Sequence, residues 1–438
     1  YISVGGPGPS AKPFAGVSLS VVHCSCSQIE VLQKELPEFE EDTGMKVTIE
    51  TPAWAGMREK MILDFTAHTA YYDVVNYDCV WRAEWIENGW LWPLDDYIAR
   101  DAAEVNITDF PPAFLAHSSR WKGKYYGFPI MSHLGIFMYR TDLAAQYAPG
   151  ITPPDTMDEL VEFIHKLTVD TNGDGKIDVY GAGQLAGKTP GLIYDWANFL
   201  WGYGGDFFDS KLNPIWNSDI GVHALEVYKD LVLNYGHPDE RSWSTQDELN
   251  TAFTHGLVAT CSRENFVLTT LLDPKNNPNH YADVGWALTP GKTAKGEHPA
   301  FIGSMNIGIN ADSKKKEAAW EFIKWATSRE IHKKFVLGGG TGTTSRYSVM
   351  RDPELLAMQP YLALQPAGME NPKPRPSLPE WPKIEEYLMD SISSCLSGER
   401  TAKQALDYAA TEARIILQEA GYYTTRAAEA ARIQAEEV

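Results

Sequence analysis

The stretch from Tyr125 to Asp142 reads YYGFPIMSHLGIFMYRTD, and it decides the fold. Most of its residues favour a β-strand, but Gly127 and Pro129 interrupt the strand pattern near its beginning. We therefore interpret it as a hinge strand, a single extended segment that leaves one folded unit and enters another. Gly127 and Pro129 are expected to lie near the bending point.

Strands and helices alternate in the residues before this stretch. The predicted strands are Val17–His23, Lys46–Thr51 and Asp73–Tyr77. Helices are predicted after the first two, one opened by a Ser27/Glu30 capping box and the other at Met57–Thr66. This order predicts an α/β fold, with parallel-type sheets flanked by helices. In such sheets ligands bind beyond the carboxyl ends of the strands.

Size and composition narrow the functional classes. With 438 residues, 44% of them hydrophobic and 22% charged, the chain is long enough for two lobes, each with its own core. A formal net charge of −20 without a basic patch argues against nucleic acid as a partner. The 14 Trp and 21 Tyr, many beside Gly, Asn or Asp, suit ligands with apolar faces and polar edges. Sugars and polyols have this character.

The two ends of the chain differ from its middle. Residues 1–14 are rich in Gly, Pro and Ser, and we expect them to form a flexible leader. Residues 423–438 are rich in Ala, Glu and Arg without an apolar stripe, which indicates a tail. No stretch approaches the roughly 20 apolar residues of a membrane span. We expect a periplasmic or extracellular protein, with any membrane tether provided by a segment absent from this chain.

The five cysteines are Cys24, Cys26, Cys79, Cys261 and Cys395. They form no Cys-x-x-Cys pair and have no His partner at zinc spacing, so a metal site built from them is disfavoured. Cys24 and Cys26 follow one predicted strand and Cys79 follows another, and parallel neighbours would bring these ends together. One disulfide among them is therefore a candidate.

The segment 170–178 reads DTNGDGKID and has the oxygen spacing of a calcium loop. The predicted ligands are Asp170, Asn172, Asp174, the carbonyl of Lys176, and Asp178. The twelfth position of the loop, where such loops carry a bidentate Glu, is Gly181. The alternative to a structural calcium ion is a solvated acidic turn.

Several phrases along the chain together resemble the family 1 extracellular solute-binding proteins of ABC importers, of the carbohydrate-binding type. These phrases are Glu38–Val47, Tyr72–Val75, Gly89–Asp95, Met138–Leu143, Pro153–Leu160, Ala252–Phe253 with Gly256–Thr260, Leu288–Gly291 and Ala318–Ile323. They occur in the order of the family and cover nearly the whole chain. The resemblance implies a receptor without catalytic activity or cofactor that closes on its ligand by hinge motion and delivers it to a membrane permease. We expect it to be monomeric.

The resemblance also implies two lobes joined by three crossings. After the hinge strand, Val284–Leu288 should return the chain to the first lobe, and Gly338–Gly340 should carry it back to the second. The first lobe is then predicted to contain residues 15–129 and 289–340, and the second residues 130–288 and 341–422. A substitution at Gly127 should change ligand binding through closure and not through contact.

Topology, aromatic placement and the resemblance nominate residues for the cleft. Trp54, Asp78 and Trp81 follow strand ends of the first lobe, and Ser132 lies in the hinge strand. The second lobe offers the aromatic and amide side chains Trp196, Asn198, Trp201 and Tyr203. The family places ligand contacts after a strand that here ends near Arg263 and Glu264, and at a backbone segment that here contains Gly303 and Ser304. Arg346 follows the last crossing.

Two other functions fit parts of this set. A glycoside hydrolase would use a pair of carboxylates such as Asp78 and Glu264 across a glycosidic bond. A receptor for a sugar phosphate would use Arg263 or Arg346 to bind the anionic group. The many Trp residues disfavour a receptor for polyamine, metal or inorganic phosphate.

Overall fold

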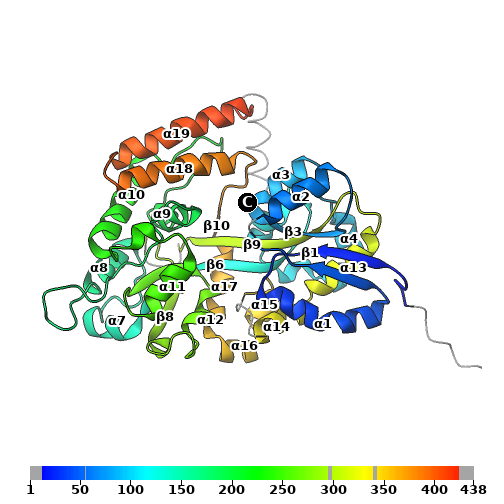
Figure 1. Ribbon diagram of the computed structural model, residues 1–438, viewed down its shortest axis with the longest axis horizontal. Helices are drawn as coiled ribbons and strands as arrows, with labels where there is room; N and C mark the ends of the chain where they lie inside the picture. Colours follow the sequence, from blue (N-terminus) through cyan, green and yellow to red (C-terminus); the bar gives the residue numbers. More distant parts are fainter. Residues whose placement is uncertain (1–11, 55, 294–297, 339–342, 424–438) are drawn as a thin grey trace, which may run out of the picture.

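The computed structural model describes residues 12–54, 56–293, 298–338 and 343–423. Figure 1 shows two lobes, with the first lobe on the right, the second on the left, and the long strands β6 (Phe128–Arg140) and β9 (Ala300–Ile309) running through both. Most of the predicted leader and tail lies outside the described residues. Within them, no helix combines the length and the apolar character needed to cross a bilayer.

The first lobe contains the predicted parallel strands. Its strands are β1 (Ser18–Val22), β2 (Lys46–Glu50) and β3 (Val74–Asp78). They are parallel in the order β2-β1-β3, and β9 continues the sheet antiparallel to β3. The helices of this part are α1 (Ser27–Thr43), α2 (Met57–Thr66), α3 (Arg82–Glu87), α4 (Asp95–Arg100), α5 (Ala102–Val105), α6 (Pro112–Ser118), α13 (Lys316–Ala326) and α14 (Arg329–Leu337). The short strands β4 (Arg120–Trp121) and β5 (Lys124–Tyr125) form the hairpin that leads into β6.

The second lobe is built on the other half of β6. Strands β7 (Thr260–Glu264) and β8 (Val284–Leu288) both pair antiparallel with it. The larger helices are α7 (Thr141–Tyr147), α8 (Met157–Lys166), α9 (Pro190–Gly202), α10 (Asp219–Asp230), α11 (Gln246–Thr254), α12 (Val267–Leu271), α18 (Trp381–Leu396) and α19 (Ala402–Glu419). The connecting elements are α15 (Tyr347–Met350), α16 (Pro353–Met358), α17 (Gln365–Glu370) and β10 (Pro372–Pro374), and β10 pairs with the start of β9.

The remaining helical elements of the described residues are short 3-10 helices and one π-helix. They are Cys79–Trp81, Ile107–Asp109, Leu231–Tyr235, Glu240–Ser242, Tyr281–Asp283 and Pro360–Leu364. One predicted helix start is wrong: Cys26 and not Ser27 caps α1, and the hydroxyl of Ser27 donates to the side chain of Gln28. The two-lobed α/β architecture is nevertheless the predicted one.

The first crossing is confirmed, and the second is made by a different strand. Strand β6 is continuous from Phe128 to Arg140, with a register irregularity between Pro129 and Met131. Val284–Leu288 pairs with the second-lobe half of β6, so it does not return the chain to the first lobe. Strand β9 makes the return, because it pairs with β10 at its start and with β3 at its end. Of the third predicted crossing, Gly339 and Gly340 lie outside the described residues.

The hydrophobic cores locate the point at which both strands change lobes. Met131 and Met305 belong to the first-lobe core, which also contains Phe65 and Trp85. Leu134 and Ile302 belong to a cluster on the second-lobe side, next to the main second-lobe core around Trp196 and Phe207. The changes fall between Met131 and Leu134 on β6 and between Ile302 and Met305 on β9. These segments face each other, since Ser132 pairs with Ser304 and His133 with Gly303.

Gly127 is held tightly by its surroundings. A Cβ atom at this position would lie 2.5 Å from the hydroxyl oxygen of Tyr77 and 2.8 Å from the carbonyl oxygen of Ile307. A larger residue would therefore push β6 away from β3 and β9 within the first lobe. This close approach explains the glycine better than a bending point does.

One buried and two half-buried histidines are expected to make the protein less stable in mild acid. Burial lowers the pKa of His332 well below 6.5, and it also lowers the pKa of His133 and that of His117, the last to about 4. Between pH 6.5 and these lower values the unfolded chain binds protons that the folded chain does not bind, so stability falls as the pH falls. Each histidine contributes a slope of up to about 1.4 kcal/mol per pH unit.

Urea unfolding at pH 7 and pH 5 measures this slope. The variant His332→Gln should show a smaller loss of stability between the two pH values than the wild type. His68→Gln is the matched control, because the side chain of His68 is 72% exposed. Equal losses in the wild type and His332→Gln would contradict the prediction.

Candidate functional site

At the crossing point, where the neighbouring strands β6 and β9 pass from one lobe to the other, two consecutive side chains of β6 point to opposite faces of the sheet. Ser132 is fully buried, and its hydroxyl donates to the carbonyl of Thr344 at 2.7 Å. The next residue, His133, points to the opposite face, where its ring packs against Phe266 with centroids 5.1 Å apart. Ser132, predicted to face the cleft, thus has its hydroxyl occupied by the backbone of Thr344, and His133 lies on the other face because neighbouring side chains on a strand alternate.

His133 is a half-buried polar side chain without a full set of partners. Its Nε2 atom is buried and has no hydrogen-bond partner among the described residues. Gly303 lies opposite, and a Cβ there would meet the His133 ring nitrogen at 3.6 Å. Burial lowers the pKa of His133, so the ring is neutral at pH 7, with one nitrogen as donor and the other as acceptor.

An ion pair joins the two lobes next to His133. Asp78 at the end of β3 accepts hydrogen bonds from Arg375 Nη2 at 3.2 and 3.3 Å. Arg375 follows β10, and its guanidinium lies over the ring of Tyr194 on α9, 5.0 Å from the centroid. The hydroxyl of Tyr194 donates to Glu385 on α18 at 3.4 Å. Asp78, a predicted site residue, is thereby connected to the second lobe.

Arg375 is a functional candidate that the sequence analysis missed. Its Nε is buried and has no partner among the described residues, so it has donor capacity left. Arg375 lies in the segment NPKPRPSLP, residues 371–379, which has no helical or strand periodicity. The only local feature of the sequence that could have drawn attention to Arg375 is its position between two prolines.

Three tryptophans form a stacked wall in the first lobe. Trp54 stacks on Trp81 with ring centroids 5.7 Å apart, and Trp81 stacks on Trp85 at 5.5 Å. Trp81 and Trp85 are buried, whereas Trp54 is 50% exposed. Trp54 is thus the member whose ring can still pack against a ligand, and Trp81 supports it.

The predicted aromatic residues of α9 belong to the second-lobe core. Trp196 is fully buried and packs against Phe207, while the indole of Trp201 donates to Asp206 at 3.3 Å. Tyr203 packs against His223, and Asn198 lines an enclosed cavity of about 10 Å³. Helix α9 is buried nearly all round, since α10 and α18 pack against it. The structure therefore does not bring these four residues to the crossing point.

Arg263 and Glu264 are consecutive residues of strand β7, so their side chains point to opposite faces of the sheet. Arg263 pairs inside the second lobe with Asp195, with Nη2 and Oδ2 2.7 Å apart. Glu264 points the other way, where its carboxylate accepts from Gln246 at 2.8 Å and its charge acts on His133. Asn265 comes next, and its Oδ1 accepts from the amide of Leu134 at 3.1 Å while its Nδ2 is buried without a partner in the described part of the chain. Glu264 and Asn265 are close to the crossing point, and Arg263 is not.

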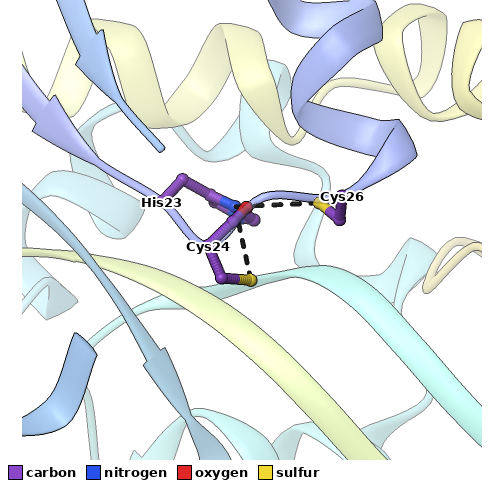
Figure 2. Close-up of side chains that lie close together, drawn as sticks. All are labelled: His23, Cys24 and Cys26. Atoms are coloured by element: carbon purple, nitrogen blue, oxygen red, sulfur yellow. Dashed lines mark hydrogen bonds between the residues drawn. The ribbon is translucent and has the colours of Figure 1, made fainter. Parts of the chain in front are cut away.

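The cysteines at the strand ends remain thiols. All five cysteines are free, so the disulfide predicted among Cys24, Cys26 and Cys79 is not formed. Figure 2 shows that Cys24 and Cys26 instead gather around the ring of His23. Cys79 lies apart from them beside Asp78, whose carboxylate oxygen is 3.5 Å from its sulfur.

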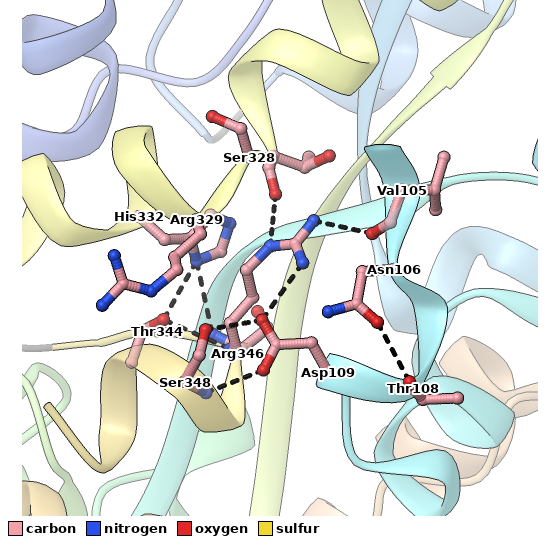
Figure 3. Close-up of polar contacts among 12 residues, drawn as sticks. Val105, Asn106, Thr108, Asp109, Ser328, Arg329, His332, Thr344, Arg346 and Ser348 are labelled. Carbon is pink, nitrogen blue, oxygen red and sulfur yellow. Dashed lines mark hydrogen bonds and ion pairs between the residues drawn. The ribbon is translucent and has the colours of Figure 1, made fainter. Parts of the chain in front are cut away.

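Arg346 and Ser304 are held on the face of the sheet opposite His133. The guanidinium of Arg346 donates to the carbonyls of Thr327 and Val105, at 2.7 and 3.1 Å, and to Asp109 at 3.2 Å (Figure 3). Arg346 is buried, and its contacts connect the segment that begins at Thr343 to the first lobe. Ser304 accepts from Asn306 at 3.0 Å. Arg346 is thus a structural clamp, which removes the main support for its role as an anion site.

Hydrogen bonds from backbone amides to its own carboxylates wrap the acidic loop 170–178. Asp170 accepts from the amides of Gly173 and Gly175 at 2.6 and 2.7 Å, and both glycines have positive φ angles. The hydrogen bond from Gly175 and those from neighbouring amides lower the pKa of Asp170. The hydroxyl of Thr171 donates to Asp178 at 2.7 Å. Within the described residues, these carboxylates do not converge as a ready-made ion site.

Comparison with protein families identifies one match over most of the chain. Residues 27–333 match the model of the bacterial extracellular solute-binding proteins. The match includes β6, β9 and the end of β3, which contribute Asp78, His133 and Gly303 to the crossing region.

Individual relatives cover nearly the full chain. A solute-binding protein of an ABC transporter from Agrobacterium radiobacter, solved in complex with ribitol, is 32% identical, with a TM-score of 0.79 over 92% of this chain and 100% of its own. The mannitol-binding protein of Pseudomonas aeruginosa is 25% identical over 90% of this chain and 91% of its own. A probable amino-acid ABC transporter periplasmic-binding protein of Sinorhizobium fredii is 24% identical over 94% and 92%.

Proposed function

Because this chain belongs to the bacterial extracellular solute-binding proteins, we propose that it captures an acyclic polyol between its lobes and delivers it to the permease of an ABC importer. The observation that carries this proposal is the similarity to the ribitol-bound protein, combined with the Asp78–Arg375 pair that links the lobes. A location outside the cytoplasmic membrane belongs to the proposal, and the extracellular character of the family supports it. A membrane tether and a monomeric state belong to the proposal as well.

The side chains at the crossing point suit a row of hydroxyl groups. Each hydroxyl of a polyol both donates and accepts a hydrogen bond. Asp78 and Glu264 supply acceptors, the free Nε of Arg375 and Nδ2 of Asn265 supply donors, and neutral His133 supplies one of each. The half-exposed ring of Trp54 offers an apolar face for the carbon chain.

The mechanism follows from the arrangement of these groups on both lobes. A ligand held by Asp78 from the first lobe and by Asn265 from the second makes all its contacts only when the lobes are closed. A preference of about 5.5 kcal/mol for the closed form moves the closed population from one to ninety-nine per cent. Hinge closure about the Ser132–His133 and Gly303–Ser304 segments can therefore be driven by ligand binding alone.

Binding rather than hydrolysis also agrees with the partners of the carboxylates of Asp78 and Glu264. A glycosidase needs one carboxyl group that is protonated and free to act as an acid. Asp78 is paired with a guanidinium, and Glu264 accepts a hydrogen bond from Gln246. The relatives are binding proteins as well.

A ligand panel tests the proposal. Thermal unfolding should be measured with ribitol, mannitol, erythritol, ribose, maltose, ribose 5-phosphate and a mixture of amino acids, and each hit should then be titrated by calorimetry. A polyol at one hundred times its dissociation constant should stabilise the protein by about 2.7 kcal/mol. Ribose is the matched control for ribitol, since its ring removes the open-chain shape. Stabilisation by amino acids alone would overturn the polyol assignment and would indicate an amino-acid receptor, the class of the Sinorhizobium relative.

We also propose that the loop 170–178 binds one calcium ion. Its backbone already has the wrapped shape, and Asp174 and Lys176 lie at the spacing of calcium ligands. Calcium titrated into chelator-treated protein should release or absorb heat with a stoichiometry of one, and Asp170→Asn should abolish that signal. Asp209→Asn is the control, because Asp209 caps a different turn by accepting from the amide of Asn213 at 2.8 Å. The absence of heat in chelator-treated wild type would remove the calcium site.

A further inference from the structure

The loop after β1 brings an imidazole and two thiols together at the edge of the crossing region. His23 Nδ1 lies 3.8 Å from the sulfur of Cys24 and 3.8 Å from the sulfur of Cys26 (Figure 2). The three ligand atoms all lie within 4.8 Å of one another. The binding of a polyol makes no use of this group.

These distances match those of a metal ion with one nitrogen and two sulfur ligands. A Zn²⁺ ion about 2.0–2.1 Å from nitrogen and about 2.3 Å from sulfur, with angles of about 109–120°, holds the nitrogen and the sulfur roughly 3.5–3.8 Å apart. Thiolate and imidazole are also the ligands that Zn²⁺ and other thiophilic ions prefer. The two observed nitrogen–sulfur separations of 3.8 Å thus match those around a bound ion.

The backbone fixes the three residues in this arrangement. The amide of His23 donates to the carbonyl of Glu50 at 3.0 Å, and that of Ser25 donates to the carbonyl of Pro52 at 2.9 Å, so the loop continues the pairing of β1 with β2. The amide of Cys24 donates to the side chain of Asn76 on β3 at 3.3 Å. Cys26 is extended, with φ −165° and ψ 166°, and precedes helix α1. The ligands are therefore positioned by β1, β3 and α1 together.

We propose that His23, Cys24 and Cys26 bind one thiophilic metal ion such as Zn²⁺. His23 is fully buried and Cys24 is buried, while Cys26 is partly exposed, so a solvent molecule can complete a tetrahedral site from the side of Cys26. In the metal-free protein Nδ1 lies 2.8 Å from the carbonyl of Cys24. Metal binding would place the imidazole proton on Nε2, which is buried without a protein partner in the described residues. Both thiols release a proton when the ion binds.

The site borders the proposed ligand contacts. The charge on Cys26 is close enough to influence the pKa of His133, and Cys24 is close enough to Asp78 to be influenced by it. A divalent ion bound by the two thiolates and the imidazole would therefore lie beside the polyol-binding groups with its charge balanced by its own ligands. The spacings of zinc fingers do not predict this site, because its three ligands lie within four consecutive residues.

Cadmium titration tests the site, because cadmium thiolates absorb in the ultraviolet where the free thiols and Cd²⁺ do not. The protein is reduced, stripped with a chelator and titrated with Cd²⁺ without oxygen. We expect a thiolate absorption band that saturates at one ion per chain and is removed by competing Zn²⁺. Cys26→Ser should weaken the binding at least a hundredfold, and Cys24→Ser should do the same. Cys79→Ser is the matched control, and it should keep the band.

Folding and polyol binding are read out separately in every variant. Circular dichroism reports folding, and Cys26→Ser, with its partly exposed side chain, remains informative where a variant at buried His23 fails to fold. A missing band in reduced wild type, or an unchanged band in Cys26→Ser, would overturn the proposal. Mass spectrometry that finds Cys24 and Cys26 joined as a disulfide after purification in chelator, with no cadmium binding after reduction, would overturn it too. Ribitol titration of the metal-free protein tests the transport proposal independently.

Discussion

Replacing Arg375 by Ala is expected to weaken polyol binding by about 30-fold to several thousand-fold, which corresponds to about 2–5 kcal/mol. Arg375 holds Asp78 through two contacts of 3.2 and 3.3 Å, and its side chain is only 15% exposed. The truncation removes a donor to the ligand and leaves the carboxylate of Asp78, itself 9% exposed, without its charged partner. Isothermal titration with the polyol identified in the panel measures the effect.

Lys373→Ala is the matched control for this variant. Lys373 lies two residues earlier on β10 and pairs with Asp206 at 3.0 Å, and both partners belong to the second lobe. The side chains of this pair are 28% and 45% exposed, so its loss should change affinity little. Arg375→Lys keeps the charge but not the planar fork of donors, and intermediate affinity is expected. Affinity equal to wild type in Arg375→Ala would show that the lobe-linking pair does not contact the ligand.

Local patterns in the sequence were sufficient to predict the architecture of the first lobe. The three parallel strands, the helices between them and the punctuated stretch that became β6 all rest on residues near one another in the chain. Helix α8 shows the same locality in the structure, since its capping box joins Thr156 and Glu159, three positions apart. The return crossing was misplaced because Val284–Leu288 and Ala300–Ile309 are both apolar strands, and only the pairing partner distinguishes them.

The functional site was harder to predict because it depends on contacts between distant residues. Arg375 meets Asp78 across 297 positions, and nothing near Arg375 indicates that partner. His133 and Asn265 reach the site through strand alternation at the crossing point, which depends on the register of β6, β7 and β9. For Trp196 and Trp201 a local signal existed, since a helix that is apolar on all sides is usually buried. The sequence PGLIYDWANFLWG of α9 has this character.

Arg263→Ala is expected to lower the free energy of unfolding by about 3–5 kcal/mol and to leave the polyol affinity of the folded protein nearly unchanged. The side chains of Arg263 and Asp195 are 5% and 0% exposed, and Nη2 donates to Oδ2 at 2.7 Å. Asp195 also accepts from the amide of Leu185, so its position is fixed by the backbone. Removal of Arg263 leaves a buried carboxylate without a cation. Urea unfolding and calorimetric titration together separate the two effects.

The double variant Arg263→Met with Asp195→Leu tests whether the unpaired charge causes the loss. Replacing both partners of a buried pair by apolar residues of similar volume is often neutral or stabilising, so the double variant should be more stable than Arg263→Ala. Lys188→Ala is the control for an ordinary ion pair, because Lys188 and Asp390 are 58% and 53% exposed and should contribute at most about 1 kcal/mol. Wild-type stability in Arg263→Ala, combined with lost polyol affinity, would contradict the prediction. That result would return Arg263 to the ligand-binding role that the sequence analysis assigned to it.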